Sequence, residues 1–275
     1  MKPEALDWLL EPRDPPIRLH TLTDILQHPP DSREVASAQK SILSYQPVRR
    51  ILSAQTSKGY WPPETTCYRP KYTATVWPLI LLGEMGVPPE PHIKTAIEHF
   101  LSLHQMNNGA FSWVSRRDKR MKMEEEACLT GNMIRTLVVF GYGEDPRVRK
   151  AIDWMPEHQQ EDGGWNCDYP LRKVKHSSFM STVEPLWAYS EIPRSKWTRK
   201  VKHSIERGAE FLLMHHVYKS DHHDWTPTEL WGEQPTRFHF PMYYYYDALH
   251  GLRVLVKLGY GGDERVRDAV HLVLS

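Results

Sequence analysis

The sequence contains few cysteines: Cys67, Cys128 and Cys167 are three among 275 residues. An odd number of cysteines at scattered positions cannot form the disulfide framework that holds small secreted domains together. The N-terminus, MKPEALDWLLEPRDPP, also lacks the charged stretch followed by an apolar stretch of a secretory signal. Both features predict a protein of the reducing cytoplasm.

Long hydrophobic runs and net charge are missing as well. No apolar run approaches the roughly 20 residues that a membrane-spanning helix needs. Lys and Arg together number 35, Asp and Glu together 34, and the net charge of +1 gives no overall field that attracts nucleic acid or an anionic membrane. The sequence therefore predicts no transmembrane segment and no nucleic-acid partner.

Aromatic residues, by contrast, are plentiful, with ten Trp and thirteen Tyr, and many of them stand in an internal repeat. Four segments combine an amphipathic stretch, a polar anchor and an aromatic turn: residues 51–61, 100–113, 154–165 and 207–225. Their anchors, spaced by 50, 54 and 57 residues, are Gln55, Gln105, Gln159 and His216. These spacings leave room for one helical hairpin in each repeat.

Apolar stretches of helical period lie between the anchors, at residues 73–86, 127–143, 179–192 and 242–261. We expect them to form inner helices, with more polar outer partners, in an all-α chain of about five stacked hairpins. The repeats run roughly over 17–61, 73–113, 126–165, 178–225 and 240–275, and we expect one domain over residues 1–275.

The fifth repeat is expected to be incomplete. Aligning Arg147 with Arg265 gives an offset of 118 residues, which would place the counterpart of Gln159 at position 277, beyond Ser275. A truncated chain and closure by a second chain in a homo-oligomer both fit this pattern.

The anchors carry a family resemblance. Gln159, Gly163, Gly164 and Trp165, together with residues 207–216 and Trp225, resemble the glutamine-tryptophan repeat of squalene cyclases and, more loosely, the repeats of protein prenyltransferase β subunits. This resemblance covers the chain from about residue 17 onward. It implies an α/α toroid whose inner helices enclose a hydrophobic cavity, and an isoprenoid ligand. The repeated glutamines are expected to be structural, each capping neighbouring backbone beside a Trp.

The chain departs from the cyclases at their catalytic motif. These enzymes protonate their substrate with an Asp-rich motif that leads into an inner helix, whereas the matching residues 67–72 here include no carboxylic acid, and no Asp-Asp-x-x-Asp motif for magnesium occurs. The next hairpin instead begins with Glu124, Glu125 and Glu126. Burial of adjacent carboxylates raises the pKa of one of them enough to hold a proton near neutral pH, which would make a general acid. The alternative is an acidic first helical turn in solvent.

Protein prenyltransferases hold zinc with an Asp-x-Cys pair and a His, but here the pair is absent and Tyr244 stands where the His is expected. A toroid would instead bring other possible Zn²⁺ ligands to one rim: Cys128, Cys167, His176 and His239. A second metal candidate is the segment 221–224, preceded by His215 and His216. The alternative for the first group is a structural role, in which the cysteines are small buried side chains. The alternative for the second group is a polar surface loop.

Two further sets of residues suit an isoprenoid ligand. Aromatic rings on the inner helices would stabilise carbocations or pack an isoprenyl tail, and these are Trp77, Phe179, Trp187, Tyr243, Tyr244 and Tyr246. Basic residues on the loops that lead into the inner helices would attract an anionic head group, and these are Arg69, Lys71, Arg172, Lys175 and the run 116–122. Core filling and simple solvation are the alternatives.

Glu184 and Asp247 are isolated acids in apolar surroundings. Each is either a structural acid that is hydrogen-bonded or a functional residue. In the functional case Glu184 would contact the ligand, and Asp247 would be a second candidate proton donor. As a pair of inward-facing carboxylates, they would suit a glycoside-processing α/α barrel. The glutamine-tryptophan repeat argues against this alternative.

Taken together, these patterns predict a terpenoid cyclase-like or prenyltransferase-like protein that binds an isoprenoid or similar apolar molecule and transforms it by proton-initiated cyclisation or isomerisation. The alternative is a non-catalytic helical-repeat scaffold that binds a partner protein.

Overall fold

The computed structural model describes residues 3–168, 174–221, 225–227 and 234–275. This described part is helical except for loops and one short antiparallel pair, β1 (Lys219–Ser220) and β2 (Thr226–Pro227). The all-α prediction is therefore confirmed. None of the described helices combines the length and the apolar character needed to span a membrane, in agreement with the prediction.

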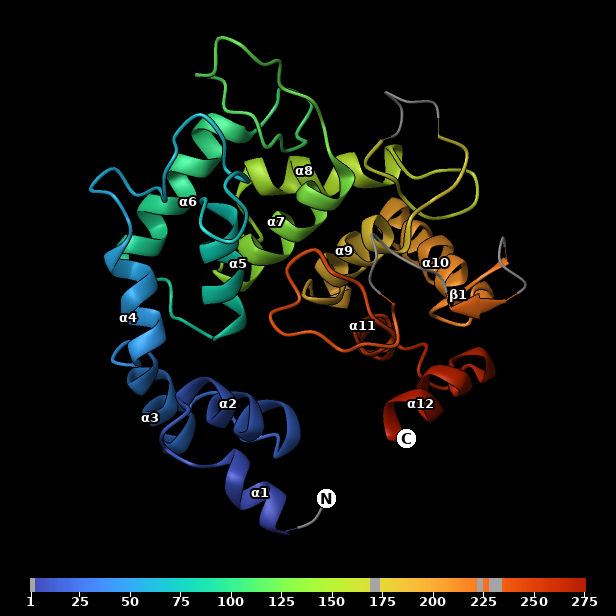
Figure 1. The fold of residues 1–275 in the computed structure, drawn as a ribbon, viewed down its shortest axis with the longest axis horizontal. Coiled ribbons are helices and arrows are strands. Elements are labelled where there is room, and N and C mark those ends of the chain that lie inside the picture. The colour runs from blue at the N-terminus through green and yellow to red at the C-terminus, as the bar shows by residue number, and fades with distance from the viewer. Residues whose placement is uncertain (1–2, 169–173, 222–224, 228–233) are drawn as a thin grey trace. The chain divides into compact units, whose positions relative to one another are not determined.

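The chain divides into two compact units, Met1–Leu103 and His104–Ser275. The helices of the first unit, coloured blue to teal in Figure 1, are α1 (Pro3–Leu9), α2 (Pro15–His20), the π-helical turn η1 (Thr21–Ile25), α3 (Arg33–Ile42), α4 (Gln46–Ser53), α5 (Val76–Glu84) and α6 (Pro91–His104), which ends at the boundary.

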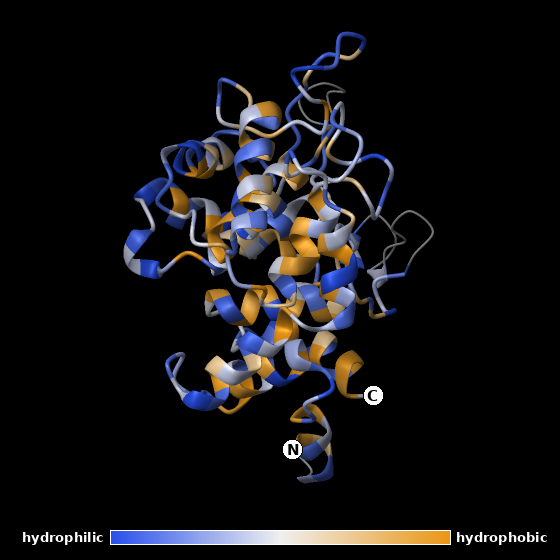
Figure 2. Ribbon diagram, turned by 90° about the vertical axis from the view of Figure 1, so that its left-hand side faces the viewer, coloured by the Kyte–Doolittle hydropathy of each residue, from blue (hydrophilic) through white to orange (hydrophobic). Residues whose placement is uncertain are grey.

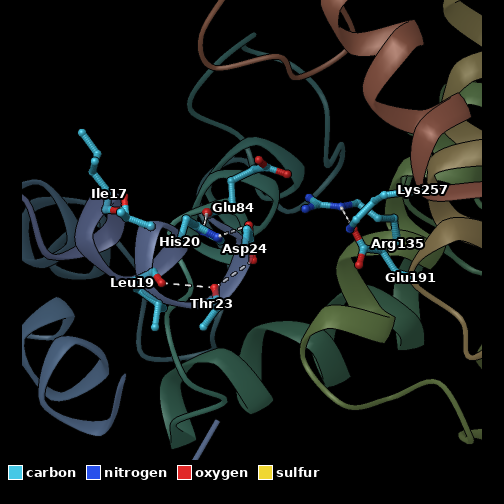
Figure 3. Close-up of polar contacts among 10 residues, drawn as sticks. Ile17, Leu19, His20, Thr23, Asp24, Glu84, Arg135, Glu191 and Lys257 are labelled. Carbon is cyan, nitrogen blue, oxygen red and sulfur yellow. Dashed lines mark hydrogen bonds and ion pairs between the residues drawn. The ribbon is translucent and has the colours of Figure 1, made fainter. Parts of the chain in front are cut away.

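The core of the first unit forms around α5, whose sequence VWPLILLGE is apolar on almost every side. A helix without a polar face has to be buried, and Val76, Leu79 and Leu82 are fully inaccessible to solvent. The end of α5 is tied to α2, because His20 Nε2 lies 2.8 Å from the Glu84 carbonyl oxygen (Figure 3). His20 Nδ1 is 3.2 Å from Asp24 Oδ2, and this hydrogen bond raises the pKa of His20.

The second unit, green to red in Figure 1, contains α7 (Ala127–Val139), α8 (Pro146–Glu157), α9 (Phe179–Ser190), η2 (Arg194–Lys196), α10 (Arg199–Met214), α11 (Ala248–Leu258), η4 (Glu264–Val266) and α12 (Arg267–Leu274). Helix α9 packs against α7, and also against α10 and α11. Figure 2 shows that hydrophobic residues gather on the helices, whereas many loops are hydrophilic.

The close packing of α7 on α9 depends on Gly131. A Cβ atom at this position would lie 2.6 Å from the backbone nitrogen of Pro185 and 2.8 Å from the carbonyl carbon of Glu184. Any larger side chain would therefore push the two helices apart.

The predicted inner segments are helical in their central parts, as α5, α7, α9 and α11. The fourth differs from the prediction at its start, because Tyr243, Tyr244 and Tyr246 precede α11 instead of belonging to it. Asp247 begins this helix as its N-cap, with Oδ1 accepting a hydrogen bond of 2.8 Å from the His250 backbone N–H. An N-cap residue is not itself helical, so the tyrosine run stays in the loop before it.

The three glutamine turns share one hydrogen-bond pattern. In each, the glutamine Nε2 donates to a glycine carbonyl four residues later, at 2.9, 3.1 and 2.6 Å for Gln55, Gln105 and Gln159. The same Nε2 also donates to a backbone carbonyl of the second α-helix after the turn, α6, α8 or α10, at 3.0, 2.7 and 2.9 Å; the acceptors are His92, Arg147 and Ser204. The structural role predicted for these glutamines is thus confirmed.

The same turns end in a buried aromatic residue that is hydrogen-bonded to a buried threonine. The backbone N–H groups of Trp61, Phe111 and Trp165 donate to Thr75, Thr130 and Thr182 Oγ1 at 3.2, 3.0 and 3.0 Å. This bond ties each turn to the start of α5, α7 or α9. The segment with His216 as its anchor does not reproduce the pattern, because its Trp225 is 50 % exposed.

Candidate functional site

The entrance of α7 holds the candidate acid, Glu126. Its backbone is extended, at φ −134° and ψ 121°, and it precedes the first helical residue without its side chain capping the helix. Its N–H donates to the Phe111 carbonyl at 3.4 Å, and its own carbonyl accepts from the Thr130 N–H at 2.9 Å. The backbone is therefore fixed on both sides, and the carboxyl group is not used as a cap.

The carboxyl group of Glu126 is partly buried beside other acids. Burial, followed by repulsion from Asp168 and Glu124, raises the pKa of Glu126 to about 7. Near neutral pH this group holds its proton in about half of the molecules and can donate it. This is the direction of shift expected for one of the three glutamates.

The other two glutamates have different surroundings. Glu124 is exposed, and its backbone N–H donates to Ser112 Oγ at 3.1 Å. Glu125 Oε2 accepts a hydrogen bond of 3.3 Å from Asn108 Nδ2. Asn108 also lines a pocket of about 500 Å³, together with Met106, Asn107, Arg116 and Met123. Glu126 is thus the partly buried member of this run whose pKa is raised to about 7.

Two cysteines lie next to the acid. Cys128, the second residue of α7, forms a disulfide bond with Cys167, with the Cα atoms 6.2 Å apart. The Cys167 sulfur also accepts hydrogen bonds from the Cys128 N–H at 3.2 Å and from the Ser181 hydroxyl at 3.3 Å. The remaining cysteine, Cys67, is a buried thiol in the first unit.

This disulfide corrects the view that the cysteines stay apart as thiols. It also removes the cysteine-based argument for a reducing compartment. Sequence analysis could not foresee the pair, because 39 residues separate the two cysteines and only the packing of α7 on α9 brings them together.

The four predicted zinc ligands do not form one donor set. Two of them are joined as the disulfide, His176 is exposed, and the His239 ring stacks on Tyr245 at 5.2 Å and lies 3.5 Å from Asp247 Oδ2. Within residues 3–168, 174–221, 225–227 and 234–275, no group of three or more His, Cys, Asp or Glu side chains is placed to hold a metal ion. In the second candidate, residues 222–224 lie outside the described residues.

Asp247 has a structural position. Besides capping α11, its Oδ2 accepts a hydrogen bond of 2.9 Å from the His239 backbone N–H, and its side chain is 1 % exposed. Both carboxylate oxygens thus bind backbone groups. Glu184 is completely buried in α9, where it precedes Pro185.

The predicted aromatic residues fall into separate clusters. Phe179, the first residue of α9, contacts the rings of Tyr246, His215 and Phe211 at centroid distances of 5.3, 5.3 and 5.6 Å. The Tyr246 hydroxyl donates to the Val217 carbonyl, and burial raises the pKa of Tyr246. This cluster begins at the same end of α9 as Ser181, the hydrogen-bond donor to Cys167.

Tyr243 and Tyr244 are both buried in the loop before α11. The carbonyl of Tyr243 accepts a hydrogen bond of 2.8 Å from the side chain of Asn132, in the middle of α7. This contact ties the loop to α7.

Trp187 is covered by cations instead of facing an open space. The Arg135 guanidinium lies 3.8 Å from its ring centroid, and that of Arg253 lies 5.3 Å away. The edge of the His250 ring meets it at 4.5 Å, and burial, with help from the two arginines, lowers the pKa of His250 to about 3. This histidine is therefore neutral at neutral pH.

The charge of Arg135 is balanced by Glu191, which follows α9. Arg135 Nε lies 3.9 Å from Glu191 Oε1, and Lys257 Nζ donates to the same oxygen at 2.8 Å (Figure 3). Sequence analysis missed Arg135 and His250 as buried residues. The signal was an arginine inside the apolar run 133–139 and a histidine inside the apolar run 248–255.

The remaining candidates lie elsewhere. Trp77 packs in the first unit against Tyr68 and Tyr72, at 4.7 and 5.1 Å. Its Nε1 donates to the Tyr68 carbonyl at 2.7 Å. Of the predicted basic residues, Arg69, Lys71, Lys175 and the basic residues of the run 116–122 are exposed, and Arg172 lies outside the described residues.

Compared with known protein families and with curated protein sequences, the chain matches none. The candidate site therefore stands on its own geometry: Glu126 with Asp168 and Glu124, the disulfide with Ser181, and the nearby aromatic cluster at Phe179. Asp168 and Ser181 were missed by sequence analysis, although Asp168 directly follows Cys167.

Proposed function

We propose that the protein is a divergent member of the squalene cyclase and prenyltransferase repeat family, an α/α toroid that binds an isoprenoid or similarly apolar molecule. The support for this family is the shared hydrogen-bond pattern of the three glutamine turns. We also propose the cytoplasm as its location and a homo-oligomer as its assembly.

The proposed chemistry is protonation of the ligand by Glu126, and its raised pKa is the observation that carries the proposal. The O–H bond of the carboxyl group breaks as a new C–H bond forms at one carbon of a double bond. The π bond supplies the electrons, so a cation is left on the other carbon and a carboxylate on Glu126. Loss of a proton from a neighbouring carbon then gives an isomerised or cyclised alkene.

The surroundings of Glu126 suit this step. Repulsion from Asp168 and Glu124 stabilises its protonated form, and the later carboxylate is a base that can take a proton back. Phe179 and Tyr246 form an aromatic pair at the adjacent end of α9, and aromatic faces stabilise cations.

The test is turnover by the Glu126→Gln variant. Squalene and farnesol, dispersed in detergent, would be incubated with protein, and the extracted products separated by gas chromatography with mass detection. The wild type is expected to give a rearranged alkene, and Glu126→Gln to lower the rate by at least about 100-fold. Glu125→Gln is the matched control, because this neighbour binds Asn108.

Wild-type binding without any product would contradict the catalytic part of the proposal. Equal turnover by Glu126→Gln and Glu125→Gln would remove Glu126 as the donor. Absence of binding to either probe, measured by native mass spectrometry, would contradict the isoprenoid ligand.

A second candidate function is a non-catalytic helical-repeat scaffold. The observation that favours it is the covering of Trp187 by Arg135, which turns a predicted ligand-facing ring into a buried structural contact. The carboxylate of Asp247 also favours this function, because it accepts hydrogen bonds from two backbone N–H groups. This function predicts a specific partner protein and no turnover.

A further inference from the structure

The disulfide at the entrance of α7 has a different environment from an inert structural cross-link. Both cysteines are only partly buried, so small molecules can reach them. Cys67, in contrast, is fully buried.

The two sulfur atoms of the pair are not equivalent. Cys167 Sγ accepts hydrogen bonds from the Cys128 N–H at 3.2 Å and from the Ser181 hydroxyl at 3.3 Å. Hydrogen bonds of this kind stabilise a negatively charged sulfur more than a neutral one. The N–H belongs to the first turn of a 13-residue helix, whose N-terminal end also favours negative charge.

Charged neighbours act in the opposite direction. Asp168 follows Cys167 directly, and its carboxylate opposes a thiolate there. Glu126 opposes it less, since its pKa of about 7 leaves it partly protonated at neutral pH. The two hydrogen bonds at Cys167 act against this repulsion.

We propose that Cys128–Cys167 is a redox-active disulfide that exchanges with small thiols and dithiols, with Cys128 as the attacked sulfur and Cys167 as the leaving thiolate. A disulfide breaks faster when its leaving thiolate is the more stable one. This activity goes beyond the proposed isoprenoid chemistry and does not depend on it.

The exchange with a dithiol balances in two steps. A thiolate of the reagent attacks Cys128 Sγ and forms a mixed disulfide, while the electron pair of the broken bond stays on Cys167 Sγ, which takes a proton from water. The second thiol of the reagent, after losing its proton, attacks the reagent's own sulfur. This closes a cyclic disulfide and releases Cys128 as a thiolate, which takes a second proton from water. The protein thus gains two electrons and two protons, and the dithiol is oxidised.

The experiment uses folded protein and mixtures of reduced and oxidised dithiothreitol. Samples taken over time are quenched in acid, unfolded, alkylated with a maleimide and weighed by mass spectrometry. The oxidised chain should carry one alkylated thiol, Cys67, and the reduced chain three. Circular dichroism recorded in parallel should show that reduction occurs without unfolding.

Ser181→Ala removes one hydrogen bond to the leaving sulfur and should slow reduction by about two- to ten-fold. Ser190→Ala is the matched control, because Ser190 lies at the other end of α9 and donates to the Trp187 carbonyl at 2.7 Å. If Ser181→Ala fails to fold, Ser181→Thr serves instead, since it keeps the hydroxyl group and should keep the wild-type rate.

Three free thiols in air-oxidised protein would overturn the proposal. So would a disulfide that yields to dithiothreitol only when the protein unfolds. Equal reduction rates in Ser181→Ala and Ser190→Ala would remove the assigned role of Cys167 as leaving group.

Discussion

The entrances of α7 and α9 are built on the same backbone scaffold but carry different side chains. Each begins with an extended residue, Glu126 or Ser178, whose N–H donates to the carbonyl of the aromatic residue in the preceding turn, at 3.4 and 2.8 Å. Four residues later, Thr130 and Thr182 bind the N–H of that aromatic residue. The repeat thus supplies the position, and one substitution within it supplies the acid.

The entrance of α5, in the first unit, extends the comparison. Four residues before Thr75, the threonine equivalent to Thr130, stands Lys71, which is exposed. Of the three residues at this position, Lys71, Glu126 and Ser178, only Glu126 carries a carboxyl group, so the scaffold alone does not produce chemistry. A residue that departs from its repeat partners is a better functional candidate than one that matches them.

The largest loss of stability is expected when the buried aromatic residue of a turn is truncated. Trp165 is fully buried, and its Nε1 donates to the Met155 carbonyl at 2.9 Å. Trp165→Ala should lower the free energy of unfolding by about 3 to 5 kcal/mol, measured by urea denaturation. Trp225→Ala, at a half-exposed position outside the pattern, is the control and should cost under about 1 kcal/mol. Equal losses would contradict the special role of the turn.

The chemical difference at α7 should appear in the pH dependence of stability. The pKa of Glu126 is about 7 in the folded chain, against an ordinary value of 4.5. Between these values the folded chain holds one more proton than the unfolded chain, so its stability falls as the pH rises from 4.5 to 7 and then stays constant. The total loss is up to about 3 kcal/mol.

Glu126→Gln keeps a neutral side chain at all pH values. Relative to the wild type, it should gain up to about 3 kcal/mol at pH 8 and little at pH 4. Glu125→Gln should show no such divergence. If the free energy of unfolding of wild type and Glu126→Gln changed with pH in parallel, the entrance of α7 would not hold a carboxyl group with a raised pKa.

The glutamine of the turn should have a smaller effect. Gln159 Nε2 holds two backbone carbonyls, those of Gly163 and Ser204. Gln159→Ala should cost about 1 to 3 kcal/mol in urea denaturation, because both acceptors lose a partner. Gln105→Ala should lower the free energy of unfolding by a similar amount if the turns are equivalent. A difference above about 1 kcal/mol between the two variants would show that the turns are not equivalent.

The smallest effect is expected at the start of α11. Asp247→Ala should cost about 1 kcal/mol as a lost N-cap. Asp247→Asn should cost less, because its amide oxygen can still cap the His250 N–H, although its NH₂ group cannot accept a hydrogen bond from the His239 N–H. Thermal unfolding measures both. A large loss of turnover in Asp247→Asn at unchanged stability would instead restore Asp247 as a proton donor.

Much of the scaffold could be predicted from the sequence, since it follows local rules. The apolar period of residues 127–143 predicts α7, and Gln159 with Gly163 and Trp165 predicts a stapled turn. The acid could be predicted in part, because a Glu run before an apolar helix is visible, but which of the three is buried depends on packing. The disulfide, Arg135 and His250 depend on contacts between helices far apart in the chain, which no local pattern encodes.

The most direct test of the account is the pKa of Glu126, measured from its ¹³C carboxyl shift by NMR in isotopically labelled protein, with Glu126→Gln to assign the resonance. The account predicts a midpoint near 7. A midpoint near 4.5, the ordinary glutamate value, would contradict it.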